Sequence, residues 1–500
     1  MTDDPVTGDP VTGDPVTGDR VESIGRKASS GLRWSLLGNT VTKAASFVMS
    51  LVLARLLATE DFGVYAVALA ATQFVMVVKD AGVMAAVIQW RGRVSEIAPT
   101  ATVLAFCFAT GLYGLFWAGA PYFAALAGSE PATGVVRLLT AVILVEAVTA
   151  VRSAVLMREF AQDRLAAANL AGFAVNATVA ISLAAAGAGA YSFAWGQLGG
   201  AIVTGAVIVR LARMPWRFGF DRAIAARLLR FGLPSALGFG LEAVLMNSSF
   251  VVVGAVLGEQ QLGYYLLAFN VSSWVPGVIG TALRYVALPG FSRLAEDPDS
   301  LSEGVRRSVP LLVSFVMPVA LVMATLAHPL ITFLYEPRWA PAAPVLSFLS
   351  VLMVVRMITS YLVTDILIST GATRSTVWLN LGWALALLPA LIIGAHLGGI
   401  TGAAIGHAAV AVLVALPLGA LLLRRQGVRL RGVLPGLLRP ALASAVTCAY
   451  LTALAAAFAW PPLPELLVVG GSGLVVFALL AMPRAMLGRL TRRGRTYVRL

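Results

Sequence analysis

Charged residues are scarce in this sequence. Only 12% of its 500 residues are charged, whereas 59% are hydrophobic and the mean hydropathy is +0.85. Soluble domains carry about 25% charged residues, and a soluble fold of this length could not hide so much apolar surface, whereas a fold that faces lipid need not hide it. The composition therefore excludes an ordinary soluble protein and predicts an all-α polytopic membrane protein.

Residue patterns that carry catalysis are also missing. The two cysteines, Cys107 and Cys448, stand far apart in apolar runs and form neither a metal spacing nor a disulfide framework. The sequence holds no phosphate-cradling P-loop, no His/Cys/Asp cluster at metal spacing and no Gly-x-Ser-x-Gly. We therefore expect a protein that is not an enzyme and has no cofactor. Without a nucleotide-binding motif, any energy-requiring step would draw on an ion gradient, with H⁺ or Na⁺ as the coupling ion.

Long apolar runs are abundant. A helix needs about 20 apolar residues to cross the hydrocarbon core, and on this criterion the sequence predicts about fourteen spans. Short turns such as 185–192 and 395–402 separate the closest neighbours. The predicted spans are 34–57, 62–79, 98–119, 133–152, 166–186, 189–209, 231–257, 262–284, 308–330, 343–368, 375–395, 398–423, 436–459 and 463–482.

Basic residues test this count. With the N-terminus in the cytoplasm, 32 of the 37 Lys and Arg residues fall on the inner side. Arg55, Arg137 and Arg338 fall outside, and Lys43 and Arg356 lie inside spans. One missed span would invert every later loop, so the bias supports the count and places both termini of a multi-pass membrane protein in the cytoplasm. The net charge of +13 then needs no nucleic-acid partner.

An internal repeat divides the chain. Shifting the sequence by 200 residues aligns LATEDFGVYAVA (57–68) with LGEQQLGYYLLA (257–268), and a weaker register at 210 aligns 140–149 with 350–359. Both members of the first pair follow odd-numbered spans, so the repeat is parallel, as in transporters that alternate access around a central cavity. Chance similarity among apolar helices is the competing interpretation.

The predicted organisation is two homologous six-helix lobes with an accessory C-terminal pair of helices. The N-terminal tail contains three DPVTG units, whose regular prolines and low apolar content favour disorder. The domains are a disordered tail (1–25), an N-lobe of helices 1–6 (26–213), a C-lobe of helices 7–12 (214–430), accessory helices 13 and 14 (431–482) and a basic cytoplasmic tail (483–500).

Four charges are predicted to lie within the membrane. A charge at the bilayer centre costs roughly 2.5–3.5 kcal/mol on insertion scales, so each needs a reason. Lys43 and Arg356 are candidate cavity cations for an anionic phosphate group, whereas Glu146 and Glu242 are candidates for coupling or gating. The alternative is that these charges form salt bridges that only hold helices together.

Other polar residues are weaker candidates. Asn39 shares the helical stripe of Lys43, and Asn247 could join helices by hydrogen bonds. We interpret Arg284 and Asp365, together with Asp80, as anchors near inner helix ends rather than ligands. His407 is a proton-relay candidate that is more simply a packed polar residue, and Trp339 is predicted to be a membrane-interface anchor.

Several segments resemble a known family. LVLARLLATEDFGVYAVA (51–68), DAGVMAAVIQ (80–89), RFGLPSALGFG (230–240), LPGFSRLAEDPD (288–299), RWAPAAPVL (338–346) and GITGAAIG (399–406) resemble, in order and spacing, the bacterial polysaccharide flippases. These are the O-antigen and teichuronic-acid exporters of the multidrug/oligosaccharidyl-lipid/polysaccharide exporter superfamily. The sequence departs from the family at Glu336-Pro337, where relatives often have Gly-Glu. It also differs on predicted span 7, where relatives often place an Asp or Asn near the middle and this chain has Asn247, Ser248 and Ser249.

The resemblance implies a flippase for an undecaprenyl-pyrophosphate-linked oligosaccharide that works by alternating access, with Lys43 and Arg356 near the pyrophosphate. Its partners would be that lipid-linked oligosaccharide, membrane lipids, a polysaccharide polymerase and glycosyltransferases. The alternatives are a multidrug or cation antiporter of the same superfamily, a membrane glycan polymerase or ligase, and a non-transporting scaffold. Short outer loops disfavour the polymerase, and buried charge disfavours the scaffold.

Overall fold

A computed structural model of the chain describes residues 38–89, 94–159, 161–212, 214, 219–274, 277, 280, 290–295, 297–457 and 461–481. Within these ranges, the side chains at 77, 79–89, 94–95, 231–246 and 373 lie outside the description. The predicted N-terminal tail, the basic C-terminal tail, Arg284 and the side chains of Glu242 and Asp80 therefore lie outside the described residues. The described part of the chain is helical and contains no strand.

The first lobe (residues 38–212) is a bundle of consecutive helices. It begins with a helix over residues 38–56, here called the first helix, whose apolar residues continue into the turn at 57–58. The helices that follow are α2 (Thr59–Gln89), α3 (Val94–Leu126), α4 (Ala132–Thr140), α5 (Val142–Arg158), α6 (Gln162–Ala185) and α7 (Tyr191–Leu211).

The second lobe (residues 219–430) repeats this pattern with more interruptions. Three of its segments are π-helical or 3₁₀, and the accessory pair follows it. The elements are α8 (Arg222–Leu257), α9 (Glu259–Ser272), α11 (Pro298–Thr325), α12 (Ala327–Tyr335), η2 (Pro337–Trp339), α13 (Ala342–Arg356), η3 (Met357–Val363), α14 (Thr364–Ser369), α15 (Thr373–Val410), η4 (Ala411–Ala415) and α16 (Leu416–Arg425); the pair comprises α17 (Val433–Ala457), α18 (Pro462–Pro464), η5 (Glu465–Gly470) and α19 (Gly471–Ala481).

Two tight turns occur where the sequence predicts them. The turn at 185–192 separates α6 from α7. In α15, Gly398 and Gly399 leave helical geometry, and Gly399 has φ +59°, a conformation that residues with a Cβ rarely adopt. Helix α15 therefore consists of two antiparallel helices joined at a glycine turn, as expected for predicted spans 11 and 12.

Apolar length agrees with membrane spanning. Among the described residues, nine helical stretches are long and apolar enough to cross a membrane. The prediction of an all-α polytopic membrane fold is confirmed, whereas the total of fourteen spans stays a prediction, as do the exact domain limits.

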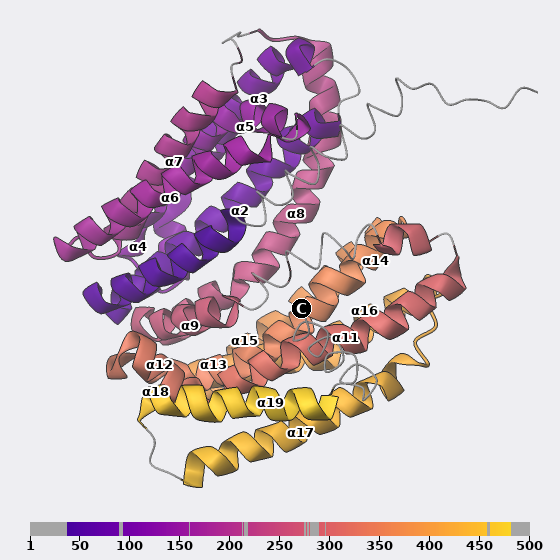
Figure 1. Ribbon diagram of the computed structural model, residues 1–500. Coiled ribbons are helices and arrows are strands. Elements are labelled where there is room, and N and C mark those ends of the chain that lie inside the picture. Colours follow the sequence, from indigo (N-terminus) through magenta and orange to yellow (C-terminus); the bar gives the residue numbers. More distant parts are fainter. Residues whose placement is uncertain are drawn as a thin grey trace, which may run out of the picture.

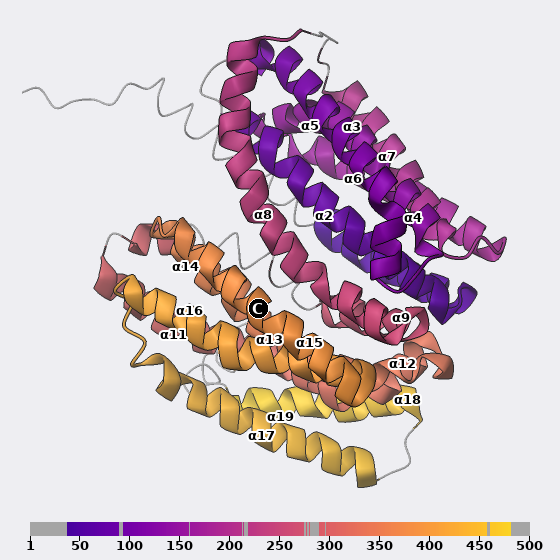
Figure 2. The ribbon, with the colours of Figure 1, turned by 180° about the vertical axis from the view of Figure 1, so that it is seen from behind.

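The two lobes meet at one end and diverge toward the other (Figures 1 and 2). The long helix α8 lies between them, packed on α2 of the first lobe and on α15 of the second. Helices α17 and α19 pack against α11, on the side of the second lobe that faces away from the first.

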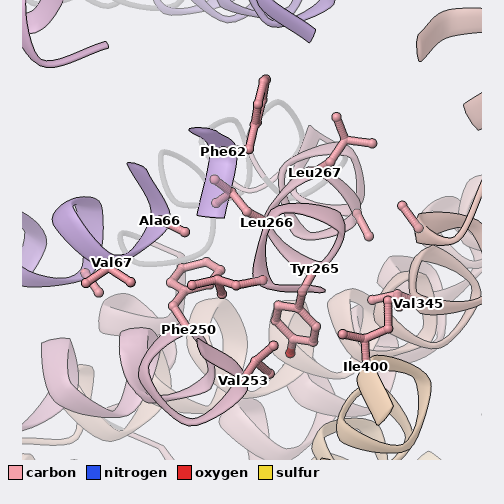
Figure 3. Close-up of a cluster of buried hydrophobic side chains, with 14 of the residues drawn as sticks. Phe62, Ala66, Val67, Phe250, Val253, Tyr265, Leu266, Leu267, Val345 and Ile400 are labelled. Carbon is pink, nitrogen blue, oxygen red and sulfur yellow. The ribbon is translucent and has the colours of Figure 1, made fainter. Parts of the chain in front are cut away.

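The main hydrophobic core crosses from one lobe to the other. Figure 3 shows Phe62 and Ala66 of α2 beside Phe250 of α8 and Leu266 of α9, all of them buried. Such continuous apolar contact holds the lobes together at the end where they meet. That end is the predicted outer side, because it contains the turns after the first helix and after α8.

Candidate functional site

The second lobe caps the end of the first helix. Nη2 of Arg338 donates to the carbonyl oxygens of Ala54 (2.6 Å) and Arg55 (2.9 Å), and Nε1 of Trp339 donates to the Ala54 oxygen (3.1 Å). The last carbonyls of a helix lack intrahelical partners and carry partial negative charge, so a guanidinium satisfies and complements them. These bonds join segments more than 280 residues apart in sequence.

Trp339 is enclosed rather than placed at a membrane interface. Its side chain is 0% exposed, and its ring stands edge-on to Phe62 (centroids 4.9 Å apart) and to Tyr264 (5.9 Å). The prediction of an interface anchor is therefore wrong, because both the ring and its N–H are used in the contact between the lobes.

A reciprocal pair of glycines brings the backbones of the two lobes close together. A Cβ on Gly63 would overlap the carbonyl oxygen of Glu259, and a Cβ on Gly263 would overlap that of Thr59. The numbers differ by 200 in both cases, so the contact has approximate two-fold symmetry and agrees with the predicted repeat. Only glycine permits backbones to approach this closely.

A second reciprocal contact lies beside the first. The Gly128 turn, which follows α3, packs on the backbone of Gly254 and Ala255 at the end of α8. In the equivalent contact, Arg338 and Trp339 of the other lobe meet the backbone of Ala54 and Arg55, whose numbers are 200 below those of Gly254 and Ala255. We call the region formed by these two contacts and the glycine pair the outer seam.

Lys43 lies on the first helix beside the second lobe. Its side chain is exposed, and Nζ is 3.6 Å from where a Cβ on Gly277 of the second lobe would stand. One turn further along the first helix, the rings of Phe47 and Trp274 meet with centroids 3.8 Å apart. From Lys43 to Ala54 the helix rises about 16 Å, and over this length the first helix meets the second lobe at Gly277, Trp274 and Arg338.

Arg356 belongs to a buried polar cluster in the second lobe. Its guanidinium carbon lies 5.8 Å from the centroid of the Phe269 ring, within cation–π range. Tyr265 and His407 are nearly inaccessible (0% and 5% exposed), and the Tyr265 hydroxyl is 3.2 Å from Nδ1 of His407. Tyr265 was not identified as functional from the sequence, although its identity with Tyr65 in the repeat was visible there.

The first lobe has a counterpart of this cluster. Nε2 of Gln197 donates to the hydroxyl of Tyr65 at 2.6 Å. Tyr65 and Tyr265 differ by 200 in number, and Gln197 and His407 by 210, which are the two registers of the repeat. Glu146, which is half-buried on α5, corresponds to Arg356 in the second register. The hydroxyl of Thr149 donates to the Glu146 carbonyl at 3.1 Å.

The remaining candidates are spread over both lobes. Asn247 is half-buried on α8. Asp365 is 3% exposed on α14, so its interpretation as an interfacial anchor is wrong. Arg152, which was assigned to the inner surface from the sequence, is 2% exposed within α5, where Nη1 lies 3.4 Å from the Val148 carbonyl oxygen. Arg152 is the last residue of the predicted span 133–152, so the sequence pattern indicated the membrane surface rather than a buried position.

A cavity of about 470 Å³ opens beside the start of the first helix. Among the described residues, seven line it, of which four are polar and none is charged. The lining consists of Gly38, Asn39, Thr42, Gln162, Leu165, Ala166 and Asn169. Asn39, one of the accessory candidates, therefore lines a cavity.

These features define a polytopic membrane protein with a two-lobed transporter fold. A solved structure named as the lipid II flippase MurJ in an inward closed conformation superposes with a TM-score of 0.74, covering 89% of this chain and 98% of that one at 14% identity. At this identity the likeness concerns the fold alone.

The chain matches the model of the family described as "Polysaccharide biosynthesis protein" over residues 52–344, and it belongs to that family. It is 26% identical over 321 residues to the succinoglycan biosynthesis transport protein ExoT of Rhizobium meliloti, covering 63% of this chain and 64% of that protein, a little under two thirds of it. It is 22% identical over 405 residues to the lipopolysaccharide biosynthesis protein WzxC of Escherichia coli, covering 78% and 80%.

Proposed function

We propose that this protein is a flippase that moves an undecaprenyl-pyrophosphate-linked oligosaccharide across the bacterial plasma membrane by alternating access between its two lobes. The protein transports its substrate and does not catalyse a reaction on it. The names of the relatives, which refer to succinoglycan transport and to lipopolysaccharide biosynthesis, support a polysaccharide precursor as the substrate.

The observation that carries the proposal is the position of Lys43. An ammonium group in a predicted span stands exposed beside Gly277 of the second lobe, about 16 Å inward of the contacts that Arg338 and Trp339 make in the outer seam. A pyrophosphate that enters between the lobes from the predicted inner side would therefore meet Lys43 before it reached the outer seam. The lipid tail would stay in the bilayer while the charged head group crosses.

Alternating access would require the outer seam to part. Its contacts are close backbone approaches together with the hydrogen bonds and ring contacts of Arg338 and Trp339. Such a surface can separate and re-form as a unit, as two rigid lobes rock about a site between them. An H⁺ or Na⁺ gradient would supply the energy.

Orientation and partners follow from this proposal. Both termini would face the cytoplasm, where glycosyltransferases complete the lipid-linked substrate, and a polysaccharide polymerase would receive it on the outer side.

The experiment that tests this function is the leaflet distribution of lipid-linked glycan in cells with and without the protein. We expect undecaprenyl-linked sugar to accumulate on the inner leaflet in its absence and to decline on re-expression. An unchanged distribution together with altered drug tolerance would instead identify an antiporter.

A further inference from the structure

We propose that the cavity beside the first helix, here called the amide pocket, binds the neutral pyranose joined directly to the pyrophosphate of the lipid-linked substrate. The inference rests on the proposed function and adds a sugar subsite to it. Two parallel helices form the pocket, through residues 38–42 of the first helix and the first turns of α6.

The chemistry of the lining favours a neutral polyhydroxyl ligand. Asn39, Gln162 and Asn169 each offer an amide that both donates and accepts, and Thr42 offers a hydroxyl that does the same. Sugar hydroxyl and acetamido groups have this dual character. A phosphate would call for Arg or Lys, and a cationic drug for carboxylates or aromatic rings, and the described residues of the lining include none of these.

The size of the pocket also suits such a ligand. Its volume of about 470 Å³ lies within the range of small-molecule sites, about 300–1,000 Å³. The apolar part of the lining, Leu165 and Ala166 on α6, offers a surface for the hydrophobic face of a sugar ring. A Cβ on Gly38 would come within 3.1 Å of the Ala166 Cβ, so the two helices are already close on that side.

Position links the pocket to the cation. Asn39 precedes Lys43 by four residues, so both project from one face of the first helix, about 6 Å apart along its axis. Thr42 precedes Lys43 directly. A pyrophosphate held at Lys43 would therefore place its attached sugar beside the pocket, on the side away from the outer seam.

Binding assays with two lipid probes test this assignment. The first probe is undecaprenyl pyrophosphate without sugar, and the second is the same lipid with one neutral hexose, each titrated into the full-length protein in nanodiscs. We expect Thr42→Val and Asn169→Leu to weaken the affinity for the sugar-bearing probe about five- to tenfold, as for the loss of one hydrogen bond each. Both should leave the affinity for the sugar-free probe unchanged.

Matched variants control for folding. Thr178→Val replaces a threonine by valine, as Thr42→Val does, but at an exposed site on α6 outside the pocket, where the hydroxyl donates to the Ala174 carbonyl (2.9 Å). This variant should bind both probes normally. Thr42→Ser restores the hydroxyl and should recover sugar-dependent affinity.

The outcomes separate the two proposals. If the pocket variants weaken both probes equally, or neither, the sugar subsite is wrong although the flippase function stands. If the wild-type protein binds neither probe, the proposed function fails and the subsite fails with it. If free methyl hexoside binds as tightly as the lipid-linked hexose, the pocket recognises soluble sugar and the link to the lipid substrate is overturned.

Discussion

The two lobes place a buried tyrosine at equivalent positions but give it different partners. In the first lobe, Tyr65 accepts a hydrogen bond from the amide of Gln197, which carries no titratable proton. In the second lobe, Tyr265 meets the ring of His407, and both are more deeply buried than their counterparts. The same geometric requirement, a partner for a tyrosine hydroxyl within a helix bundle, has been met twice with different side chains.

The charges around these pairs differ in the same way. Glu146 occupies in the first lobe the repeat position that Arg356 occupies in the second, and Lys43 corresponds to Ala243. The lobes therefore share a scaffold and an outer contact, whereas their polar interiors have diverged. Symmetric features are expected to serve the motion of the lobes, and asymmetric features to serve the substrate.

Among the substitutions that test this comparison, Lys43→Met should have the largest effect on transport. Removing an asymmetric cation should reduce transport to background while the protein still inserts and accumulates, because the exposed ammonium group supports no buried packing. Lys43→Arg should retain part of the activity, since a guanidinium also binds phosphate. Leaflet distribution measures transport and membrane immunoblots measure accumulation. Normal export by the methionine variant would contradict phosphate capture, and failure to accumulate would make Lys43 structural.

Substitutions at the glycine pair should come next and should act equally in both lobes. Gly63→Ala or Gly263→Ala forces the seam apart at a backbone contact, at a cost of about 1–3 kcal/mol, typical of overpacking. We expect a cysteine introduced at Tyr264, in a background without Cys107 and Cys448, to react several times faster with an impermeant maleimide. Gly111→Ala on α3, where the added Cβ meets open space, is the matched control. If only one of the two glycine variants raised the rate of maleimide labelling, the contact would not be reciprocal.

Tyr265→Phe should destabilise the protein more than Tyr65→Phe. The first change leaves Nδ1 of a buried histidine without its hydroxyl partner, which costs about 1–3 kcal/mol, whereas Gln197 is only half-buried and can find water. Thermal unfolding in detergent compares the two variants. Equal shifts in Tm would mean that burial does not distinguish the pairs.

His407→Gln should have the smallest effect, because it copies the solution found in the first lobe. We expect a stability change within about 1 kcal/mol, as for a hydrogen bond replaced by a similar one, and transport of at least half the wild-type rate. Transport assayed across a proton gradient tests this expectation. Loss of proton-driven transport by a stable variant would show that His407 carries the coupling proton.

The sequence predicted the scaffold well, because its signals are local. Apolar runs, glycine turns and the 57–68/257–268 repeat are each visible within a few dozen residues, and the structure places these repeat segments against each other. The partners of the repeated tyrosines were not predicted, because Gln197 and His407 lie more than 130 residues from them.

The error at Trp339 has a similar cause. An aromatic residue near the end of an apolar run is typical of a membrane interface. Its contact with the Ala54 carbonyl depends on a segment 285 residues earlier, which no local pattern reveals. Whether the four charges act on substrate or only hold helices together stays a prediction for the same reason.

The glycine contact also has a consequence for the ancestry of the chain. A surface in which residue 63 meets 259 while 263 meets 59 is self-complementary, as in a two-fold symmetric dimer. A single six-helix half would carry both sides of this contact and could associate with an identical copy. Joining two copies in one gene would keep the interface and release each half to change its interior, which would allow one half to acquire a lysine and the other a histidine.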